Sequence, residues 1–237
     1  MTSTTTTPLS PTARTQVNRH RDRALTDRAD LLAVLGEAVI CHVGVMMDGH
    51  PVVLPIVFGV DPDGPDEGGT LYLHGSVAAG ALSRSPDQEI CVTVTHVDAL
   101  VLARSAFHHS MNYRSAVVIG RARCVDGEEK ARALDAIVDQ VVPGRSETLR
   151  AHTRKELAAT TVIAIPLHEA SVKQRTGGVS DDQSDVDAGV WAGVLPLHTV
   201  AGEVQVDPDV DGQPVPGDVR RLEDRFTGTS RRPSAPS

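Results

Sequence analysis

The sequence has 237 residues, a formal net charge of −8, 40% hydrophobic residues and only 3% aromatic residues. This length accommodates one good-sized domain with tails, and an acidic balance without a lysine or arginine block argues against nucleic-acid binding. No run of about 18 apolar residues is present, so the sequence predicts no membrane span.

Cysteine usage and the two ends of the chain suggest a cytoplasmic protein. Cys41, Cys91 and Cys124 lie far apart without a CxxC motif, which is typical of small buried side chains in a reducing compartment. The polar N-terminus has no apolar core of the kind found in secretory signals. Composition predicts a disordered arm at 1–24, a folded domain at 25–207 and a disordered tail at 208–237.

The folded part is predicted to begin with a helix over residues 27–36. Asp27 is suited to be its N-cap, and Gly36 could end it. Three leucines share one helical face and predict its buried side: Leu31, Leu32 and Leu35.

Residues 39–60 read as two strands around the turn signal Asp48-Gly49. Pro51 and Pro55 fall in the second strand, and each removes a backbone donor. That strand is therefore expected to be an edge, to be bulged or to face a ligand.

The middle of the chain is predicted to alternate short strands with turns, and Asp98 lies near a bend. Gly120 marks either a bulge or a close approach of another backbone. In order, we expect a loop at 61–69, a strand at 70–74, a small-residue helix at 76–85, and strands at 89–97, 99–106 and 115–125.

The clearest predicted helix is residues 126–142, which stops at Pro143-Gly144. Its apolar face consists of Ala131, Leu134, Ile137, Val138 and Val141. A weaker helix at 146–158, strands at 160–167 and 169–175, and a closing segment at 190–206 follow. Seven or eight strands joined mostly by hairpins favour a mainly β fold, an antiparallel barrel with flanking helices, over a Rossmann sheet.

Familiar cofactor and catalytic motifs are absent. The sequence contains no GxGxxG, P-loop, HExxH or GxSxG motif. The acidic run at 181–187 lacks EF-hand spacing and predicts a solvated loop. His108 and His109 point different ways on an extended chain, so one metal cannot easily use both, and no metal site is expected.

Polar residues gather where a strand is predicted to end, at His74, Gly75 and Ser76. A helix beginning there would offer free N–H groups that bind phosphate. The alternative is simple capping by Ser76, with His74 as a polar strand end.

A second group of polar residues, Asn112, Tyr113, Arg114 and Ser115, precedes a predicted strand. Arginine binds phosphate bidentately, and Asn and Ser can hydrogen-bond a heterocycle, although a plain polar loop explains the group equally well.

Two further features could serve a ligand. Lys173 and Arg175 share one face of a predicted strand and suit an anion, or else are solvated. Trp191 is either a core or interface residue or a stacking partner for a planar ligand. Together these features fit a phosphorylated planar cofactor on a β-barrel.

Four stretches carry a family resemblance: "GHPVVLPIVFGV", "LYLHGSVAAGAL", "ALVLARSAFHHSMNYRSAVVIGRARCV" and "SVKQRTGG" followed by "VWAGVLPL". Together they resemble the flavin-binding split-barrel superfamily. The most similar branch is the pyridoxamine 5′-phosphate oxidase-like proteins related to nitroimidazole-resistance reductases. The resemblance covers residues 18–207 and implies a six-stranded antiparallel split barrel, a homodimer, and FMN at the dimer interface.

The resemblance also implies roles for the residues singled out above. The backbone of Val52, Val53, Leu54 and Pro55 would pass the flavin ring, and His74, Gly75 and Ser76 would lie near the ring or phosphate. The segment beneath the cofactor would consist of Asn112, Tyr113, Arg114 and Ser115. From the late strands, Lys173 and Arg175 would approach the cofactor, and Trp191 would close the site.

One departure from the family concerns the turn Val77-Ala78-Ala79-Gly80. Pyridoxamine-phosphate oxidases carry a lysine or arginine there, and this chain has none. The departure argues against vitamin B6 oxidation. Phosphate binding would then depend on Ser76, a helix end, and Arg114 or Lys173.

The resemblance therefore predicts an FMN-dependent oxidoreductase acting on a small, nitroaromatic-like substrate. His74 would donate a proton or hydrogen-bond the flavin. Two alternatives stay open: a non-enzymatic flavin or haem binding or sensing protein, and a deazaflavin (F420) reductase.

Overall fold

The computed structural model describes residues 9, 12–77, 82, 84–210 and 212–226. Within them, ten strands form one sheet in which all strand pairings are antiparallel. The predicted mainly β class is confirmed. Ten strands exceed the six of the resemblance because several short strands extend the sheet.

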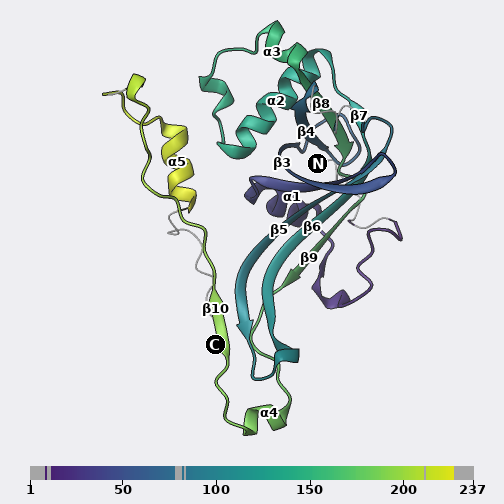
Figure 1. The fold of residues 1–237 in the computed structure, drawn as a ribbon, viewed down its shortest axis with the longest axis vertical. Coiled ribbons are helices and arrows are strands. Elements are labelled where there is room, and N and C mark those ends of the chain that lie inside the picture. Colours follow the sequence, from purple (N-terminus) through teal and green to yellow (C-terminus); the bar gives the residue numbers. More distant parts are fainter. Residues whose placement is uncertain (1–8, 10–11, 78–81, 83, 211, 227–237) are drawn as a thin grey trace, which may run out of the picture.

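The strands are β1 (Ala24–Leu25), β2 (Ile40–Met47), β3 (His50–Asp61), β4 (Thr70–Ser76), β5 (Glu89–Leu102), β6 (Ser110–Arg121), β7 (Arg123–Cys124), β8 (Thr160–Pro166), β9 (Ala170–Arg175) and β10 (Gly193–Pro196). The helices are α1 (Arg28–Glu37), α2 (Gly127–Val141), α3 (Arg154–Ala159), α4 (Gln183–Asp187) and α5 (Gly217–Phe226). As Figure 1 shows, α2 and α3 lie at the end opposite α4.

The split of the barrel lies where two long strands change partners. Residues 50–57 of β3 pair with β2, and Phe58–Asp61 pair with β4. Similarly, β6 pairs with β5 and β9, and two residues later the chain continues as β7 on β8. The main core of Val, Leu and Ile side chains fills the interior that these strands enclose, and Leu31, Val34 and Leu35 of α1 close it.

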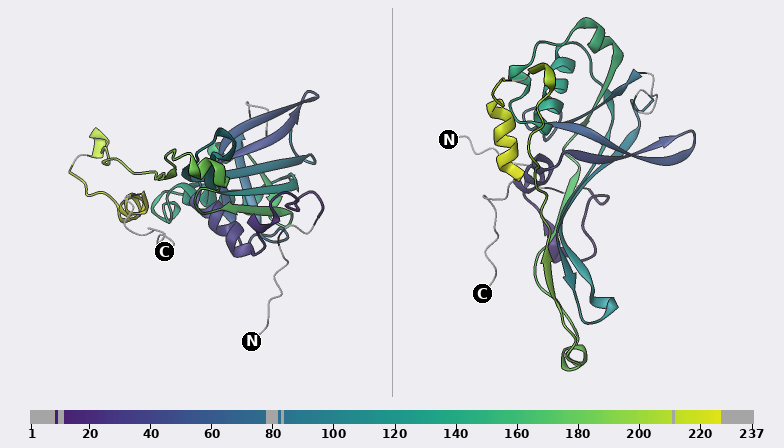
Figure 2. Two further views of the ribbon diagram at one scale, coloured as in Figure 1. Left: turned by 90° about the horizontal axis from the view of Figure 1, so that it is seen from below. Right: turned by 60° about the vertical axis from the view of Figure 1, so that its left-hand side comes forward.

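The predicted hairpin at Asp48-Gly49 is confirmed, with left-handed φ angles of 49° and 84° at the two turn residues. The hairpin projects from the body (Figure 2). Pro51 and Pro55 lie in the part of β3 that pairs on one side only, so the expectation of an edge strand holds for the described residues.

Helix α2 packs over β3 at Gly59. A Cβ built there would lie 2.7 Å from the backbone nitrogen of Ile137, so only glycine allows this approach. The buried face of α2 centres on Ala133 and Ile137. The predicted apolar face shared Ile137 but included Ala131 in place of Ala133. The contact with Gly59 sets this rotation of the helix.

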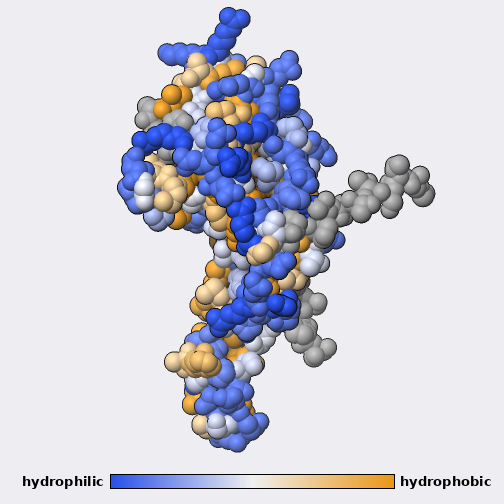
Figure 3. Space-filling model, turned by 90° about the vertical axis from the view of Figure 1, so that its right-hand side faces the viewer, coloured by the Kyte–Doolittle hydropathy of each residue, from blue (hydrophilic) through white to orange (hydrophobic). Residues whose placement is uncertain are grey.

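The strands predicted at 89–97 and 99–106 form a single strand, β5, with a bulge between Val97 and Ala99. The predicted bend at Asp98 is therefore a β-bulge. β5, β6 and β9 extend together as a long arm, along which β10 pairs with the end of β5 (Figure 1). Figure 3 shows hydrophobic surface along this arm as well as on the broader part.

The structure describes part of each end segment for which disorder was predicted. Arg14 forms ion pairs with Glu89 and Glu169, and β1 pairs with β9. In the C-terminal segment α5 forms, and Asp218 is buried against Arg145. Long-range ion pairs, which composition does not reveal, join these parts of the chain to the folded body.

Two local predictions are confirmed and one is altered. The Asp27 side chain caps α1 by accepting a hydrogen bond from the backbone N–H of Ala29, but the helix runs past Gly36 to Glu37. Gly120 lies in close approach to β8, since a Cβ there would be 3.1 Å from atoms of Ile165 and Pro166. None of the helices in the described ranges is both long and apolar enough to cross a membrane.

Candidate functional site

The candidate site is the face of the sheet that points away from the core, called here the outer sheet face. Five residues lie in one row across it, each opposite the next in the strand pairing: Pro55, His42, Thr93, Val117 and Ser171. Their neighbours along each strand, such as Val43 and Val92, are buried in the core. This row could not be assembled from the sequence because it needs the pairing of five strands.

Large apolar side chains are exposed on the outer sheet face. Ile40, Met46, Val53 and Val97 keep between 42% and 64% of their surface accessible. Within the described residues, helix α2 packs mainly over β3, β4 and β8, and α1 lies on the core side. Exposed apolar surface of this extent is typical of binding faces.

The outer sheet face brings together several of the predicted site residues. Tyr113 is paired with Arg175, and Ser115 with Lys173, at one border of the face. Val53 and Pro55 lie toward the other border, on β3. Val52 of the same strand packs against the core instead, and Leu54 is opposite Val43 in the β2–β3 pairing, on its core side.

His74 lies at the split, near the end of β4. It is paired with Val162, and the β3–β4 pairing ends one residue earlier, at Phe58 and Leu73. The side chain is half-buried and forms no hydrogen bond with another described residue. Burial lowers its pKa below the usual 6.5, so the imidazole is neutral at pH 7.

Gly75 and Ser76 belong to β4. Ser76 is paired with Thr160 in the β4–β8 ladder, and a Cβ on Gly75 would lie 3.3 Å from Leu82. Half of the predicted helix at 76–85, which includes Ala78-Ala79-Gly80 of the cation-free turn, falls outside the described residues.

Arg114 lies on the opposite face of β6 from Tyr113 and Ser115, since side chains alternate along a strand. Its guanidinium forms ion pairs with Asp98 and Glu37, at 2.8 Å and 2.6 Å. These carboxylates hold the pKa of Arg114 above its usual range and leave it electrostatically satisfied. Asn112 accepts from the Arg175 guanidinium and donates to the carbonyl of Gly177.

Trp191 precedes β10 and is 72% exposed, so it is not part of the core of this chain. The exposure of Trp191 excludes the predicted core role and leaves two, an interface residue or a stacking partner for a planar ligand.

The acidic run at 181–187 is partly built into the structure. The Asp181 carboxylate accepts hydrogen bonds from the backbone and guanidinium of Arg104, and its side chain is almost fully buried. The next acids, Asp182 and Asp185, meet His108, with potential metal-ligating atoms within 4.8 Å of one another. The sequence shows both segments but not that they meet.

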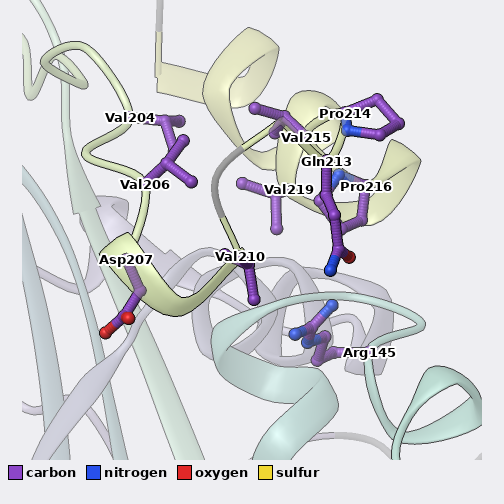
Figure 4. Close-up of a pocket in the computed structure, with 10 residues that line it drawn as sticks. All are labelled: Arg145, Val204, Val206, Asp207, Val210, Gln213, Pro214, Val215, Pro216 and Val219. Atoms are coloured by element: carbon purple, nitrogen blue, oxygen red, sulfur yellow. The ribbon is translucent and has the colours of Figure 1, made fainter.

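A shallow hollow in the described part of the chain lies between Arg145 and the C-terminal segment (Figure 4). It is lined mostly by valine and proline side chains of residues 204–219. None of the predicted site residues lines it, so it is separate from the outer sheet face.

A family model described as pyridoxamine 5′-phosphate oxidase matches residues 27–174. The FAD- and haem-binding protein from Mycobacterium smegmatis is 38% identical, with a TM-score of 0.77, and the match covers 84% of this chain and 97% of that one. No curated protein matches the chain.

Two further solved structures are similar. The flavocytochrome Anf3 from Azotobacter vinelandii is 37% identical, with a TM-score of 0.80, and the match covers 90% of this chain and 98% of that one. A candidate 5-nitroimidazole antibiotic resistance protein from Bacteroides thetaiotaomicron is 24% identical, with a TM-score of 0.51, covering 63% and 85%, and is similar in fold alone. Because the family model matches more than half of it, the chain belongs to the pyridoxamine 5′-phosphate oxidase family, with the antiparallel split-barrel fold.

Proposed function

We propose that this protein is a flavin-dependent oxidoreductase whose outer sheet face holds the flavin and a second copy of the chain. The observation that carries the proposal is the 38% identity to a protein named for binding FAD and haem, over 97% of that protein's length. The family resemblance alone implies FMN, whereas this relative favours FAD.

The residues on the outer sheet face fit a flavin. The aromatic ring system is planar and largely apolar, and the face offers exposed Val53 and Val97 without a covering helix. The one-sided pairing of residues 50–57 leaves backbone groups of β3 without a strand partner among the described residues. Such groups can hydrogen-bond the polar edge of the ring.

The same exposed apolar side chains favour a homodimer. Trp191, Val194 and Leu195, in or beside β10, add further apolar surface along the arm. A second copy covering this surface would also remove water from the flavin.

The bound flavin would supply the electron transfer. His74 would hold one proton on a neutral imidazole, from which it can donate to a ligand at the split. Partial burial of His74 limits competing hydrogen bonds with water. The electron acceptor would be a small organic molecule, for which nitroaromatic compounds are suitable probes.

The first test is the absorbance spectrum of the purified protein and the mass of the flavin released on denaturation. A yellow protein that releases FAD or FMN supports the proposal. A colourless protein that binds neither flavin when it is added, nor deazaflavin F420, would refute it. F420 binding in preference to both flavins would support the deazaflavin alternative instead.

The second test addresses His74. His74→Gln should keep its flavin but reduce nitroaromatic turnover by about 10²-fold, the usual size of a general-acid contribution. His152→Gln is the matched control, because His152 pairs with Asp135 away from the outer sheet face. Equal turnover in both variants would exclude a proton-donating role.

Haem is a second candidate ligand, because the names of the two relatives from Mycobacterium smegmatis and Azotobacter vinelandii indicate it, one as haem-binding and one as a flavocytochrome. Iron is bound by neutral imidazole, and His42 and His74 are the histidines on the outer face of the sheet in the described residues. Haem titration should give a Soret band that His42→Ala or His74→Ala shifts and His152→Ala does not. An identical band in all three variants would argue against these ligands.

A further inference from the structure

Five cations lie in residues 19–25 and on β9, two segments that strand pairing holds together, and they are called here the basic cluster: Arg19, Arg21, Arg23, Lys173 and Arg175. The pairing of β1 with β9 holds Ala24 opposite Lys173. The ammonium of Lys173 donates to the backbone carbonyl of Arg19 at 3.1 Å, which fixes the two segments against each other.

The basic cluster has no carboxylate partner within the part of the chain that the structure describes. Arg175 donates to the Asn112 amide oxygen and the Gly178 carbonyl, and Lys173 to a carbonyl, so both keep a full uncompensated charge. Asp22 is the single acid in residues 19–25 and forms no ion pair there. By contrast, Arg14, Arg104, Arg114, Arg123, Arg145 and Arg150 are all ion-paired.

Like charges in the basic cluster work against one another. Partial burial and the nearby positive charge of Arg23 lower the pKa of Arg175. This mutual repulsion is electrostatically costly, and a bound anion would reduce that cost.

The position of the basic cluster suggests which anion it binds. Lys173 and Arg175 are paired with Ser115 and Tyr113, at the border of the outer sheet face. Arg114 lies on the opposite face of β6 and is already neutralised by Asp98 and Glu37. Among the described residues, the basic cluster therefore supplies unneutralised positive charge to a phosphate at this border.

We propose that the basic cluster binds the diphosphate of a dinucleotide whose reacting ring lies on the outer sheet face. For a flavin adenine dinucleotide the inference rests on the proposed function. A nicotinamide dinucleotide that donates electrons carries the same diphosphate and is the second source of this chemistry. A diphosphate carries two negative charges. The five cations of the basic cluster suit these charges better than the single hydroxyl of Ser76 does.

The test measures the binding of FAD, FMN, riboflavin and reduced nicotinamide adenine dinucleotide phosphate to the full chain after removal of copurifying ligand. Two double variants are compared with the wild type: Arg21→Gln with Arg23→Gln, and Lys173→Gln with Arg175→Gln. The control is Arg132→Gln with Arg154→Gln, which removes two exposed charges from α2 and α3. Thermal unfolding checks that each variant is folded.

We expect each double variant to weaken FAD binding by roughly tenfold or more, and riboflavin binding by less than about twofold, because riboflavin has no phosphate. Salt should weaken FAD binding to the wild type more than to the variants.

A loss confined to the nicotinamide dinucleotide would support the basic cluster as the site of the electron donor. Unchanged affinity for both dinucleotides in both double variants would overturn the inference, even if the wild type binds flavin. A wild type that binds no flavin would instead count against the proposed function.

Discussion

The guanidinium of Arg114 on β6 donates to both carboxylate oxygens of Asp98 on β5, with Nη2 2.8 Å from Oδ1. Asp98 is the residue at the bulge between Val97 and Ala99. The pair thus joins two strands at the point where β5 bends, and Glu37 of α1 binds the same guanidinium. Arg114 is placed to stabilise the arm and not to face a ligand on the outer sheet face.

Replacing Arg114 should therefore lower stability without removing cofactor. Arg114→Met removes the guanidinium that binds the carboxylates of Asp98 and Glu37 and should reduce the free energy of unfolding in urea by about 1–3 kcal/mol. Flavin content should stay at the wild-type level. The exposed Arg132→Met is the control and should change stability by less than about 0.5 kcal/mol. Loss of flavin at unchanged stability would show instead that Arg114 binds the cofactor.

A second prediction concerns the contact between β3 and α2. Gly59→Ala would place a methyl group 2.7 Å from the backbone nitrogen of Ile137, so α2 must move. We expect a loss of about 1–3 kcal/mol in the free energy of unfolding, as for other overpacked sites. Gly36→Ala in α1 has no atom within 4 Å of the added carbon and should raise stability by about 0.5–1 kcal/mol. Equal effects of the two substitutions would contradict the close approach.

The ion pairs of Arg123 predict how stability depends on acid. Arg123 binds both Asp66 and Glu129, and Tyr72 donates to Glu129 at 3.0 Å. Hydrogen bonding from Arg123 lowers the pKa of Glu129 below 4.5. Burial pushes the pKa of Asp66 up, but hydrogen bonds from Arg123 and Thr70 outweigh it, and the result lies below 3.8.

Since both carboxyl groups have lower pKa values in the folded state, their stabilising effect is complete at neutral pH and is lost as pH falls below about 4.5. Arg123→Met should reduce stability at pH 7 and flatten the decline between pH 5 and pH 3, measured by urea unfolding. A variant that keeps the wild-type slope would show that other groups control the acid transition.

The docking of α5 gives a fourth prediction. Asp218 is buried 3.2 Å from Arg145, and Arg225 donates to the carbonyl of Gly36. Asp218→Asn weakens the first of these contacts and should speed trypsin cleavage within residues 217–226. Glu223→Gln, on the same helix without an ion pair among the described residues, is the control. Identical digestion of the wild type and Asp218→Asn would mean that the ion pair does not hold the helix.

Local signals made much of the fold predictable. The Asp48-Gly49 turn needs left-handed backbone angles, and the Asp27 cap acts on the residues that follow it, so both can be recognised in a short window. The bend at Asp98 is also local, although its nature as a bulge depends on β6.

Features that join distant segments could not be predicted from such windows. Arg14 and Glu169 are far apart in sequence, as are Arg104 and Asp181. The same holds for the candidate site, where pairing of β6 with β9 places Lys173 beside Ser115. The alternation of side chains along a strand was enough to predict that Arg114 faces away from Tyr113 and Ser115. Its neutralisation could not be predicted, because the two carboxylates come from α1 and β5.

The part of β3 that pairs on one side only, residues 50–57, has a consequence for the behaviour of the chain before any partner or ligand binds. An open strand edge is a template on which an identical chain can add its own strand and begin a growing aggregate. Pro51 and Pro55 interrupt that edge at two places, since neither has an N–H group to offer an incoming strand. The prolines thus leave the edge accessible to a small molecule while making it a poor starting point for fibrils.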